Sequence, residues 1–566
     1  MRNATLLCFL ACFMLAPSSF AQEQESKNNF ASPMGIPLIL AGTFGELRSN
    51  HFHGGIDIKT QGKQGLPVYS IGPGTVTRIK VSHWGYGKAI YVAHPNGYTS
   101  VYGHLQKFAP EIEAYVKKAQ YEKRSYEIEL FPDYGELSLG EGDLLAYSGN
   151  TGGSSGPHLH FEIRNSVSQK PTNPLLYGYE VDDTTPPNLQ EVYAYPLGNS
   201  AIVNGSKEKI QLPLTLEEDG TYTTEPVEAI GNIGFGFVAH DKQDKAYNRN
   251  GIYSAQITAN GKLLTAFDFE SFAFNETRYI NTLIDFPYFA QYRKRIQKGF
   301  RDPANALSIY SHLDNDGQLP VKAGDKIEVR LTLADIEGNT TKVRIPVIGK
   351  NQRVIQQAEV FKSAYFVPRK QNVTFDFKGA SVSFPSNSFY KDVFLDLKFE
   401  KDTFKVHDRT LAVHKNFTLS FDVSKYPASE RKQLYIGRLD KNGRANYYKT
   451  YKRESSFSAR TRDLGSFVIA KDTLAPTIRA RNFKTGQWLN NYSYLSLEID
   501  DKGTGIDTYA ASINGQWILM EYEPKNKTLT YNFDDRILNT TTCRLKVVVR
   551  DKVGNSTVFE SIFNRK

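Results

Sequence analysis

Two histidines spaced two residues apart carry the strongest chemical signal in this sequence. His158-Leu159-His160 lies in a run that extends from Gly152 to Glu162. Because side chains alternate between the two faces of a β-strand, a strand here would point both imidazoles to one side and Leu159 to the other. Two imidazoles that point the same way are often both ligands of a zinc ion, or one is a ligand and the other a base beside the metal.

A histidine and an aspartate with compatible spacing lie about a hundred residues upstream. His53-Gly54-Gly55-Ile56-Asp57 places an imidazole and a carboxylate at an even spacing, which is compatible with one strand face. The two glycines allow a close approach of the backbone. Together with one histidine of the later pair, His53 and Asp57 would supply two nitrogens and one oxygen. Three protein ligands with a fourth position open are typical of catalytic zinc.

A third histidine motif lies between these two. Tyr102-Gly103-His104-Leu105 follows a strand-like run over residues 89–93. Taken together, the His-x-Gly-x-Asp, Tyr-Gly-His-Leu and Gly-Pro-His-Leu-His-Phe-Glu motifs, in this order, resemble those of the lysostaphin-type (LytM-like) zinc metallopeptidases. The resemblance extends over residues 35–178, about a quarter of the chain.

This resemblance implies a role for each of the five motif residues. It implies that His53, Asp57 and His160 bind one Zn²⁺, and that His104 and His158 lie beside the metal. We expect His158 to be the general base, because the strand holds it next to His160 and imidazole titrates near neutral pH. His104 would then steady the attacking water or the oxyanion. Members of this family cleave peptide bonds in the cross-links or stem peptides of peptidoglycan.

The resemblance therefore predicts a zinc metalloendopeptidase that hydrolyses peptidoglycan. A second reading is a non-catalytic relative that binds peptidoglycan or activates an amidase. A third keeps the chemistry but directs it at a secreted or host protein. The sequence favours the active enzyme, because all three ligands and both neighbouring histidines are retained.

Several residues near the motifs have more than one interpretation. Glu162 would share a strand face with His158 and His160, so it either contacts a ligand or forms a solvated or salt-bridged strand end. An amide oxygen from Asn28, Asn29 or Asn50 could in principle block the metal, although no local pattern favours this.

The beginning of the chain predicts export. Residues 1–21 combine a basic start, an apolar run and a small-residue cleavage site that ends at Ala21. The apolar run is too short to span a bilayer, which takes about 20 residues. Lipidation at Cys12 is not expected, because Phe9 precedes the motif. We expect a periplasmic or cell-surface protein without a transmembrane segment, in which Cys543 is a lone, buried, reduced thiol.

Composition indicates a large, β-rich globular protein. The chain has 566 residues, of which 13% are aromatic, and a formal net charge of +9. A positive surplus suits an anionic cell wall. The sequence has no dense basic run, so we expect no nucleic-acid partner.

Repeated landmarks divide the remainder of the chain into domains. The short sequence Asp-Thr-Thr-Pro-Pro at residues 183–187 recurs as Asp-Thr-Leu-Ala-Pro at residues 472–476. The segments that follow the two sequences share Asp-Lys, Gly-Ile and Asn-Gly pairs and a closing Gly-Asn turn. Both segments resemble bacterial immunoglobulin-like β-sandwiches. We expect a peptidase domain, an Ig-like sandwich, a β-rich domain of no named family and a second Ig-like sandwich, over residues 22–182, 183–351, 352–471 and 472–566. The β-domains would bind a cell-surface protein or polysaccharide.

The expected fold is mostly β: an antiparallel β-sheet zinc endopeptidase domain with a short helical insertion, then three β-rich domains, mostly Ig-like sandwiches. Apolar residues spaced three or four apart predict a helix over Pro110–Arg124, within an insertion at residues 108–138. This insertion is either a wall or lid over the cleft or a structural appendage. A second helix is predicted over Tyr288–Phe300, inside the first sandwich.

Overall fold

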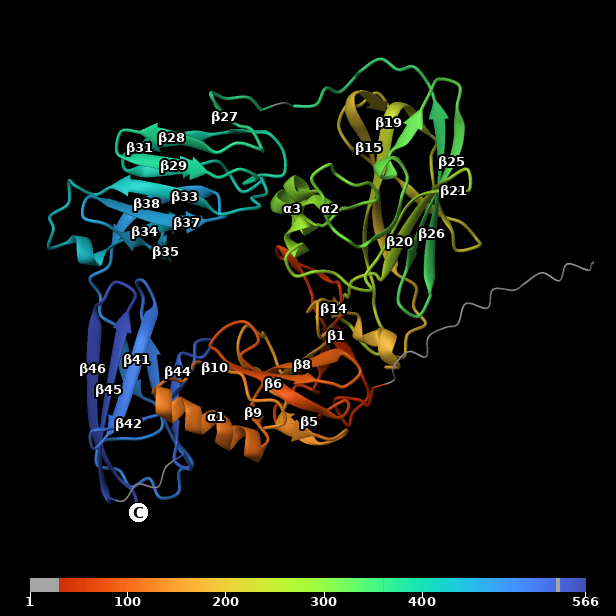
Figure 1. Cartoon of the computed structure of the whole chain (residues 1–566). Coiled ribbons are helices and arrows are strands. Elements are labelled where there is room, and N and C mark those ends of the chain that lie inside the picture. Colours follow the sequence, from red (N-terminus) through yellow and green to blue (C-terminus); the bar gives the residue numbers. More distant parts are fainter. Residues whose placement is uncertain (1–29, 360, 536–539) are drawn as a thin grey trace, which may run out of the picture.

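The computed structural model describes residues 30–359, 361–535 and 540–566. It is mostly β, as predicted, with four β-rich parts in chain order (Figure 1). The predicted signal peptide at residues 1–21, with Cys12, and the two asparagines at positions 28 and 29 lie outside the described residues. Within these ranges, no helix combines the length and the apolar character that crossing a bilayer would require.

The first part is built on a nine-stranded sheet with the order β1-β4-β13-β8-β7-β6-β10, where β11 pairs with β6 and β14 with β13. Its strands are β1 (Leu40–Gly42), β4 (Ile56–Lys59), β6 (Gly74–Val81), β7 (Lys88–Ala93), β8 (Tyr98–Leu105), β10 (Ile128–Leu130), β11 (Ser138–Leu139), β13 (His158–Asn165) and β14 (Pro171–Thr172). The smaller elements are β5 (Pro67–Tyr69), β12 (Leu144–Tyr147) and β9 (Lys107–Phe108), the hairpin β2 (Leu47–Arg48) and β3 (His51–Phe52), and the 3-10 helix η1 (Pro174–Tyr177).

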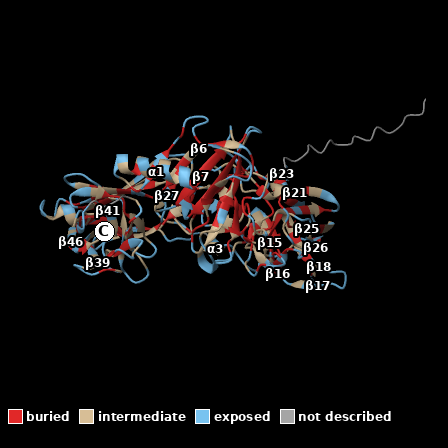
Figure 2. Ribbon diagram, turned by 90° about the horizontal axis from the view of Figure 1, so that it is seen from below, coloured by how far each residue is buried: buried red, intermediate tan, exposed pale blue. Residues whose placement is uncertain are grey.

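Strand β13 lies between β4 and β8, and its two faces differ as the sequence predicts. Leu159, Phe161 and Ile163 are fully buried in the core of this part. The alternate residues, beginning with His158 and His160, therefore point to the opposite face. Figure 2 shows that the strands β6 and β7 of the same sheet are largely buried.

Helix α1 (Pro110–Lys123) follows the sheet strands β8 and β9 and agrees with the predicted helix to within one residue. Pro110 occupies the first turn, where its missing N–H costs nothing, and Arg124 ends the helix with a positive φ of 49°. Ile112 and Val116 pack into the core of the first part.

The second part forms a twelve-stranded sheet. Its strands are β15 (Asn188–Val203), β16 (Ile210–Leu212), β17 (Leu214–Leu216), β18 (Tyr222–Thr224), β19 (Val227–His240), β20 (Ser254–Ala259), β21 (Lys262–Asp268), β22 (Gln297–Lys298), β23 (Tyr310–Leu313), β24 (Leu319–Val321), β25 (Lys326–Ala334) and β26 (Thr340–Gly349). Phe44 and Phe52 of the first part are buried in the same core as Phe269 and Phe272 of the second. The two parts therefore share a hydrophobic core.

The helix predicted over Tyr288–Phe300 is wrong in its extent. The helices here are the short α2 (Ile280–Leu283) and α3 (Phe286–Tyr292), and residues 297–298 form β22 on the edge of β19. Arg293 has a positive φ of 61° and ends α3. The apolar residues beyond it are buried against β19 in an extended segment, so their spacing does not reflect a helix.

The third part has two five-stranded sheets around one core. They contain β28 (Val373–Phe377), β29 (Ala380–Phe384), β33 (Phe417–Asp422), β37 (Ser456–Thr461) and β36 (Tyr451–Lys452), and β31 (Leu397–Glu400), β32 (Thr403–Val406), β38 (Gly465–Lys471), β34 (Leu434–Leu439) and β35 (Ala445–Tyr448), with the pair β27 (Tyr365–Val367) and β30 (Val393–Leu395) beside them.

The C-terminal part has two four-stranded sheets that share one core. They contain β39 (Thr477–Ala480), β40 (Tyr494–Asp500), β44 (Thr528–Asn532) and β43 (Glu521–Glu523), and β42 (Gln516–Ile518), β41 (Ile506–Ile513), β45 (Thr542–Asp551) and β46 (Ser556–Asn564). Cys543 is a free, fully buried cysteine of this core, as predicted.

The landmarks repeated in the second and C-terminal parts occupy equivalent places. In each part, three aspartates lie with one carboxylate oxygen apiece within 4.8 Å of the others: Asp183, Asp241 and Asp335, and Asp472, Asp501 and Asp551. The asparagine of each closing Gly-Asn turn donates to the backbone carbonyl of the first aspartate of its group, at 3.1 Å in both parts. The repeated residues thus tie the linker to the last turn in both parts.

The C-terminal part returns to the first and packs against it, beside α1 (Figure 1). Leu519 is 2% exposed and belongs to the core of the first part, and Trp517 contacts Tyr121 edge-on at 5.4 Å between ring centroids. Buried Lys88 pairs with Glu521 at 3.1 Å. The insertion therefore provides a docking surface for the last part of the chain.

Candidate functional site

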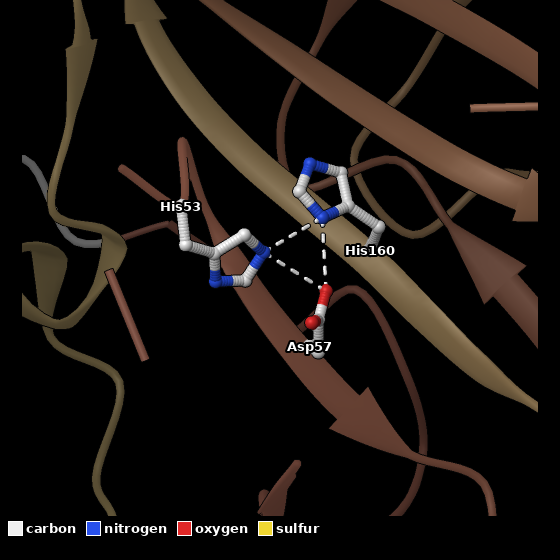
Figure 3. Close-up of side chains that lie close together, drawn as sticks. All are labelled: His53, Asp57 and His160. Carbon is white, nitrogen blue, oxygen red and sulfur yellow. Dashed lines mark hydrogen bonds and ion pairs between the residues drawn. The ribbon is translucent and has the colours of Figure 1, made fainter. Parts of the chain in front are cut away.

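The structure brings His53, Asp57 and His160 to one point (Figure 3). Asp57 Oδ1 lies 3.0 Å from His53 Nε2 and 2.9 Å from His160 Nδ1, and the two imidazole nitrogens are 3.0 Å apart. All three residues are at most 5% exposed. Two nitrogens and one oxygen therefore converge, as the sequence pattern predicts.

Strand register places Asp57 and His160 side by side, because His160 on β13 is paired with Asp57 on β4. His53 reaches the same point differently: β4 begins only at Ile56, so His53 and Asp57 do not share a strand. A turn through Gly54 and Gly55 connects them. A Cβ on Gly55 would lie 2.2 Å from the carbonyl oxygen of Phe161, so only glycine permits this approach.

In each of the two candidate ligand histidines, the ring nitrogen that faces away from Asp57 forms a hydrogen bond within the protein. His53 Nδ1 donates to the carbonyl oxygen of Thr43 at 2.8 Å, and His160 Nε2 donates to Glu162 Oε1 at 2.8 Å. These bonds fix the orientation of each ring and direct the remaining nitrogen toward Asp57. Metal-binding histidines are held in this way by a carbonyl or a carboxylate.

The arrangement suits a zinc ion. Imidazole nitrogen and carboxylate oxygen are ordinary zinc ligands, and three of them leave a fourth position for water or substrate. Arg48 Nη2 donates to Asp57 Oδ2 at 2.5 Å, which leaves Oδ1 to face the imidazoles. His53, Asp57 and His160 would thus each offer one atom to the ion.

Arg48 is a site residue that the sequence analysis did not find. It lies on β2 and is paired with His51 on β3, in a hairpin that precedes the first motif. No spacing rule connects it with Asp57. The hairpin itself, however, is signalled by the Ser49-Asn50 pair between two short strands, and Asn50 has a positive φ of 64°.

Glu162 contacts His160 and is also salt-bridged to Arg164, and because it is fully buried it is not a solvated strand end. It accepts from His160, from Arg164 Nε at 2.5 Å and from the hydroxyl of Tyr86. Burial alone would raise the pKa of Glu162, but the charge of Arg164 and the bond from His160 outweigh it and hold the pKa at about 2. Glu162 is therefore an anion that orients His160.

His104 and His158 lie next to this group, with ring centroids 4.8 Å apart. His104 Nδ1 donates to the carbonyl oxygen of Thr151 at 2.8 Å, and His158 Nδ1 donates to that of Gly156 at 2.8 Å. Both Nε2 atoms are therefore free of a proton in the neutral tautomer. His158 Nε2 lies 3.4 Å from Asp57 Oδ1, so it is directed at the same point as the three ligands.

The histidines have different proton affinities. Burial, with the charges of His160 and His158, lowers the pKa of His104 to about 3. Burial also opposes the charged form of His160, but its bonds with Asp57 and Glu162 prevail and raise its pKa to about 9. Binding of a metal ion by His160 would therefore release a proton.

The loop over residues 149–157, whose carbonyl groups hold His104 and His158, is itself held by the C-terminal part. Lys525 Nζ donates to the carbonyl oxygen of Ser154 at 3.1 Å and to that of Asn150. The side chain of Asn50, whose amide oxygen was considered above as a possible block of the metal, accepts a hydrogen bond from Asn281 at 3.0 Å.

Comparisons with known proteins agree with this site. Residues 51–121 match the model of peptidase family M23, and residues 364–472, in the third part, match that of a Zu5-like domain. The chain is 30% identical over 139 residues to the DD-carboxypeptidase/endopeptidase Mpg of Neisseria meningitidis, a match that covers 25% of this chain and 26% of Mpg. It is 31% identical over 122 residues to the peptidoglycan DD-endopeptidase ShyA of Vibrio cholerae, over 22% of each chain.

Among solved structures, the catalytic domain of the prophage-encoded M23 protein EnpA from Enterococcus faecalis shares 24% identity. This match covers 26% of the present chain and 98% of EnpA's, with a TM-score of 0.20. The chain thus matches about a quarter of the length of its curated relatives, and the family-model match at residues 51–121 includes His53, Asp57 and His104. The first part of this chain contains a peptidase domain of the M23 type.

Proposed function

We propose that this protein is a zinc-dependent endopeptidase that hydrolyses peptide bonds in the cross-links or stem peptides of peptidoglycan. The observation that carries the proposal is the convergence of His53, Asp57 and His160 beside two histidines with free Nε2 atoms. A zinc ion at this point would supply Lewis-acid catalysis, which polarises a carbonyl group and makes a water molecule more acidic.

His158 is the general base of this proposal. Its Nε2 accepts a proton from the attacking water and returns it to the leaving amine. His104 is a poor base because its pKa is about 3, and its Nε2 can only accept a hydrogen bond in the neutral form. His104 therefore orients the water, rather than donating to an oxyanion. The two histidines differ in role because their environments differ.

The name of one relative supports peptidoglycan as the substrate, and that of a second supports peptidase activity. Mpg and ShyA are named as a DD-carboxypeptidase/endopeptidase and a peptidoglycan DD-endopeptidase. The formal net charge of +9 also suits an anionic polymer. We place the protein outside the cytoplasm, in the periplasm or at the cell surface, where this substrate lies.

Digestion of purified peptidoglycan by the full chain, followed by mass spectrometry, tests the proposal. New peptide ends should appear with the zinc-loaded protein and be absent with His160→Ala and after treatment with a chelator. His312→Ala is the matched control, because His312 lies on β23, away from the site, and this variant should retain activity. Bound zinc without any product from peptidoglycan would contradict the proposal and favour the non-catalytic scaffold.

A further inference from the structure

An arginine-rich cavity lies where the first three parts of the chain meet. Its volume is about 620 Å³, and Ser49 and Asn50 of the β2–β3 hairpin form part of its wall. Helix α3 of the second part contributes Phe286 and Phe289. Six arginines line the cavity: Arg278, Arg293, Arg409, Arg438, Arg460 and Arg462.

The positive charge of this cavity is not neutralised within the described part of the chain. Asp463 is the one acidic residue in the lining, and none of the six arginines forms a salt bridge with a described residue. The Nε–H of Arg438 is buried without a hydrogen-bond partner. Four of these arginines are exposed, and Arg278 and Arg438 are partly buried. Six guanidinium groups along one recess create a positive potential that attracts an anion.

The field of these arginines acts on neighbouring groups. Burial, followed by the charges of Arg278, Lys415, Arg369 and Arg462, lowers the pKa of His414 to about 4. Burial and the charge of Arg462 also lower the pKa of Arg278. Both shifts are expected where positive charges gather in a recess with limited solvent.

The cavity continues along the β2–β3 hairpin, which precedes His53 in the sequence. A second cavity of about 600 Å³ shares four lining residues with the first and continues along His51 and Phe274. The ring of Phe274 lies against Gly54, 3.1 Å from where a Cβ would be, and Gly54 directly follows His53. A chain bound along both cavities would therefore approach Gly54, the residue that follows His53 in the sequence.

We propose that the arginine cavity is a subsite for the carboxylate groups of an acidic peptide whose scissile bond lies at His53, Asp57 and His160. This inference rests on the proposed peptidase function and adds the chemical class of the substrate. Arginine suits the task, because its planar guanidinium pairs with carboxylates through two parallel hydrogen bonds. The third part of the chain, which provides four of the six arginines, thereby takes part in substrate binding.

The test uses a wall-derived peptide with free carboxylates and the same peptide with these groups amidated. With the full zinc-loaded chain, Arg462→Gln should raise KM for the acidic peptide about tenfold, the effect of one lost charge-assisted hydrogen bond, with little change in kcat. The amidated peptide should be cleaved equally by both proteins. Arg462→Lys should bring KM for the acidic peptide part of the way back to the wild-type value. Arg479→Gln, at an exposed arginine of β39, is the control.

Binding separates this inference from the proposed function. Fluorescence anisotropy with the labelled acidic peptide and with inorganic polyphosphate needs no turnover. Arginine-dependent binding of the acidic peptide without cleavage would overturn the peptidase function and leave the subsite. Cleavage with the same KM in the wild type and Arg462→Gln would overturn the subsite. Arginine-dependent binding of polyphosphate but not of the peptide would also overturn it, in favour of a docking site for a phosphate polymer. Because Arg462 is exposed, the variant is expected to fold.

Discussion

Arg48 donates to Oδ2 of Asp57, while Oδ1 of the same carboxylate faces His53 and His160. One carboxylate thus faces a guanidinium on one side and two imidazoles on the other. Burial opposes ionisation of Asp57, but the charge of His53 and the contacts with His158, His160 and His53 hold its pKa well below the usual range. Asp57 is therefore an anion over the whole neutral range, as it would have to be to bind zinc.

Replacement of Arg48 tests how far this contact supports metal binding. Arg48→Gln removes the guanidinium that orients Asp57, so zinc affinity should fall about tenfold or more, the usual effect of losing a group that holds a ligand. Competition with a chromogenic zinc chelator at pH 7 measures it. Arg78→Gln, at a partly exposed pair with Glu129, should leave the affinity unchanged. Equal affinities for Arg48→Gln and the wild type would show that Asp57 needs no such support.

Replacement of Glu162 tests the support of His160. Glu162→Gln removes the negative charge that accepts from His160 Nε2, and zinc affinity should fall about 10- to 100-fold. The same chelator competition measures this change, with Glu129→Gln as the surface control. A loss confined to thermal stability, with unchanged affinity, would give Glu162 a purely structural role as the partner of Arg164.

Glu162 also predicts how stability depends on pH. Its folded pKa of about 2 lies below the ordinary value of 4.5, so its contribution to stability is present above pH 4.5 and is lost as the pH falls toward 2. Between pH 6 and pH 3 the wild type should lose about 2 kcal/mol more than Glu162→Gln. Urea unfolding of both proteins at the two pH values, in the presence of a chelator, measures the difference. Equal losses of unfolding free energy in the two proteins would contradict the low pKa of Glu162.

The two histidines beside the metal should affect turnover but not metal content. His158→Ala should lower kcat by about 10² to 10⁴, the usual contribution of a general base. His104→Ala should have a smaller effect, because it only orients water. Zinc analysis by mass spectrometry should find one ion per chain in both variants and in the His312→Ala control. Loss of zinc in His158→Ala would instead make His158 a ligand.

Leu519 should stabilise a part of the chain to which it does not belong. Leu519→Ala removes a side chain that is 2% exposed in the core of the first part, and should destabilise the protein by about 2–5 kcal/mol. The rate of amide hydrogen exchange should increase in α1 and β10. Leu474→Ala, at a residue that is 60% exposed, should have no such effect. Faster exchange confined to the C-terminal part would contradict a shared core.

The sequence predicts the face of β13 and the convergence of the three ligands, because strand alternation and the motif spacing are local properties. It also predicts α1, whose Ile112, Tyr115, Val116 and Ala119 pack into one core. The roles of His104 and His158 stay predictions. The Ig-like resemblance of the second and C-terminal parts also stays a prediction, although their repeated aspartates lie in equivalent places.

What the sequence does not predict depends on contacts between distant segments. Arg48 meets Asp57 only because the β2–β3 hairpin folds over the site. The helix expected up to Phe300 ends at Tyr292, because the following residues are drawn into the edge of β19. The packing of Leu519 on the first part has no local signal at all.

The return of the C-terminal part to the first has a consequence for the order in which the molecule is made. Lys88 and Glu521 are 433 residues apart in the chain. At a synthesis rate of about 5–20 residues per second, Lys88 exists for roughly 20 to 90 seconds before its partner does. A prematurely ended chain would lack Lys525, which holds the loop around His104 and His158. The contacts between the C-terminal part and the first part can therefore form only after the residues up to Lys525 have been synthesised.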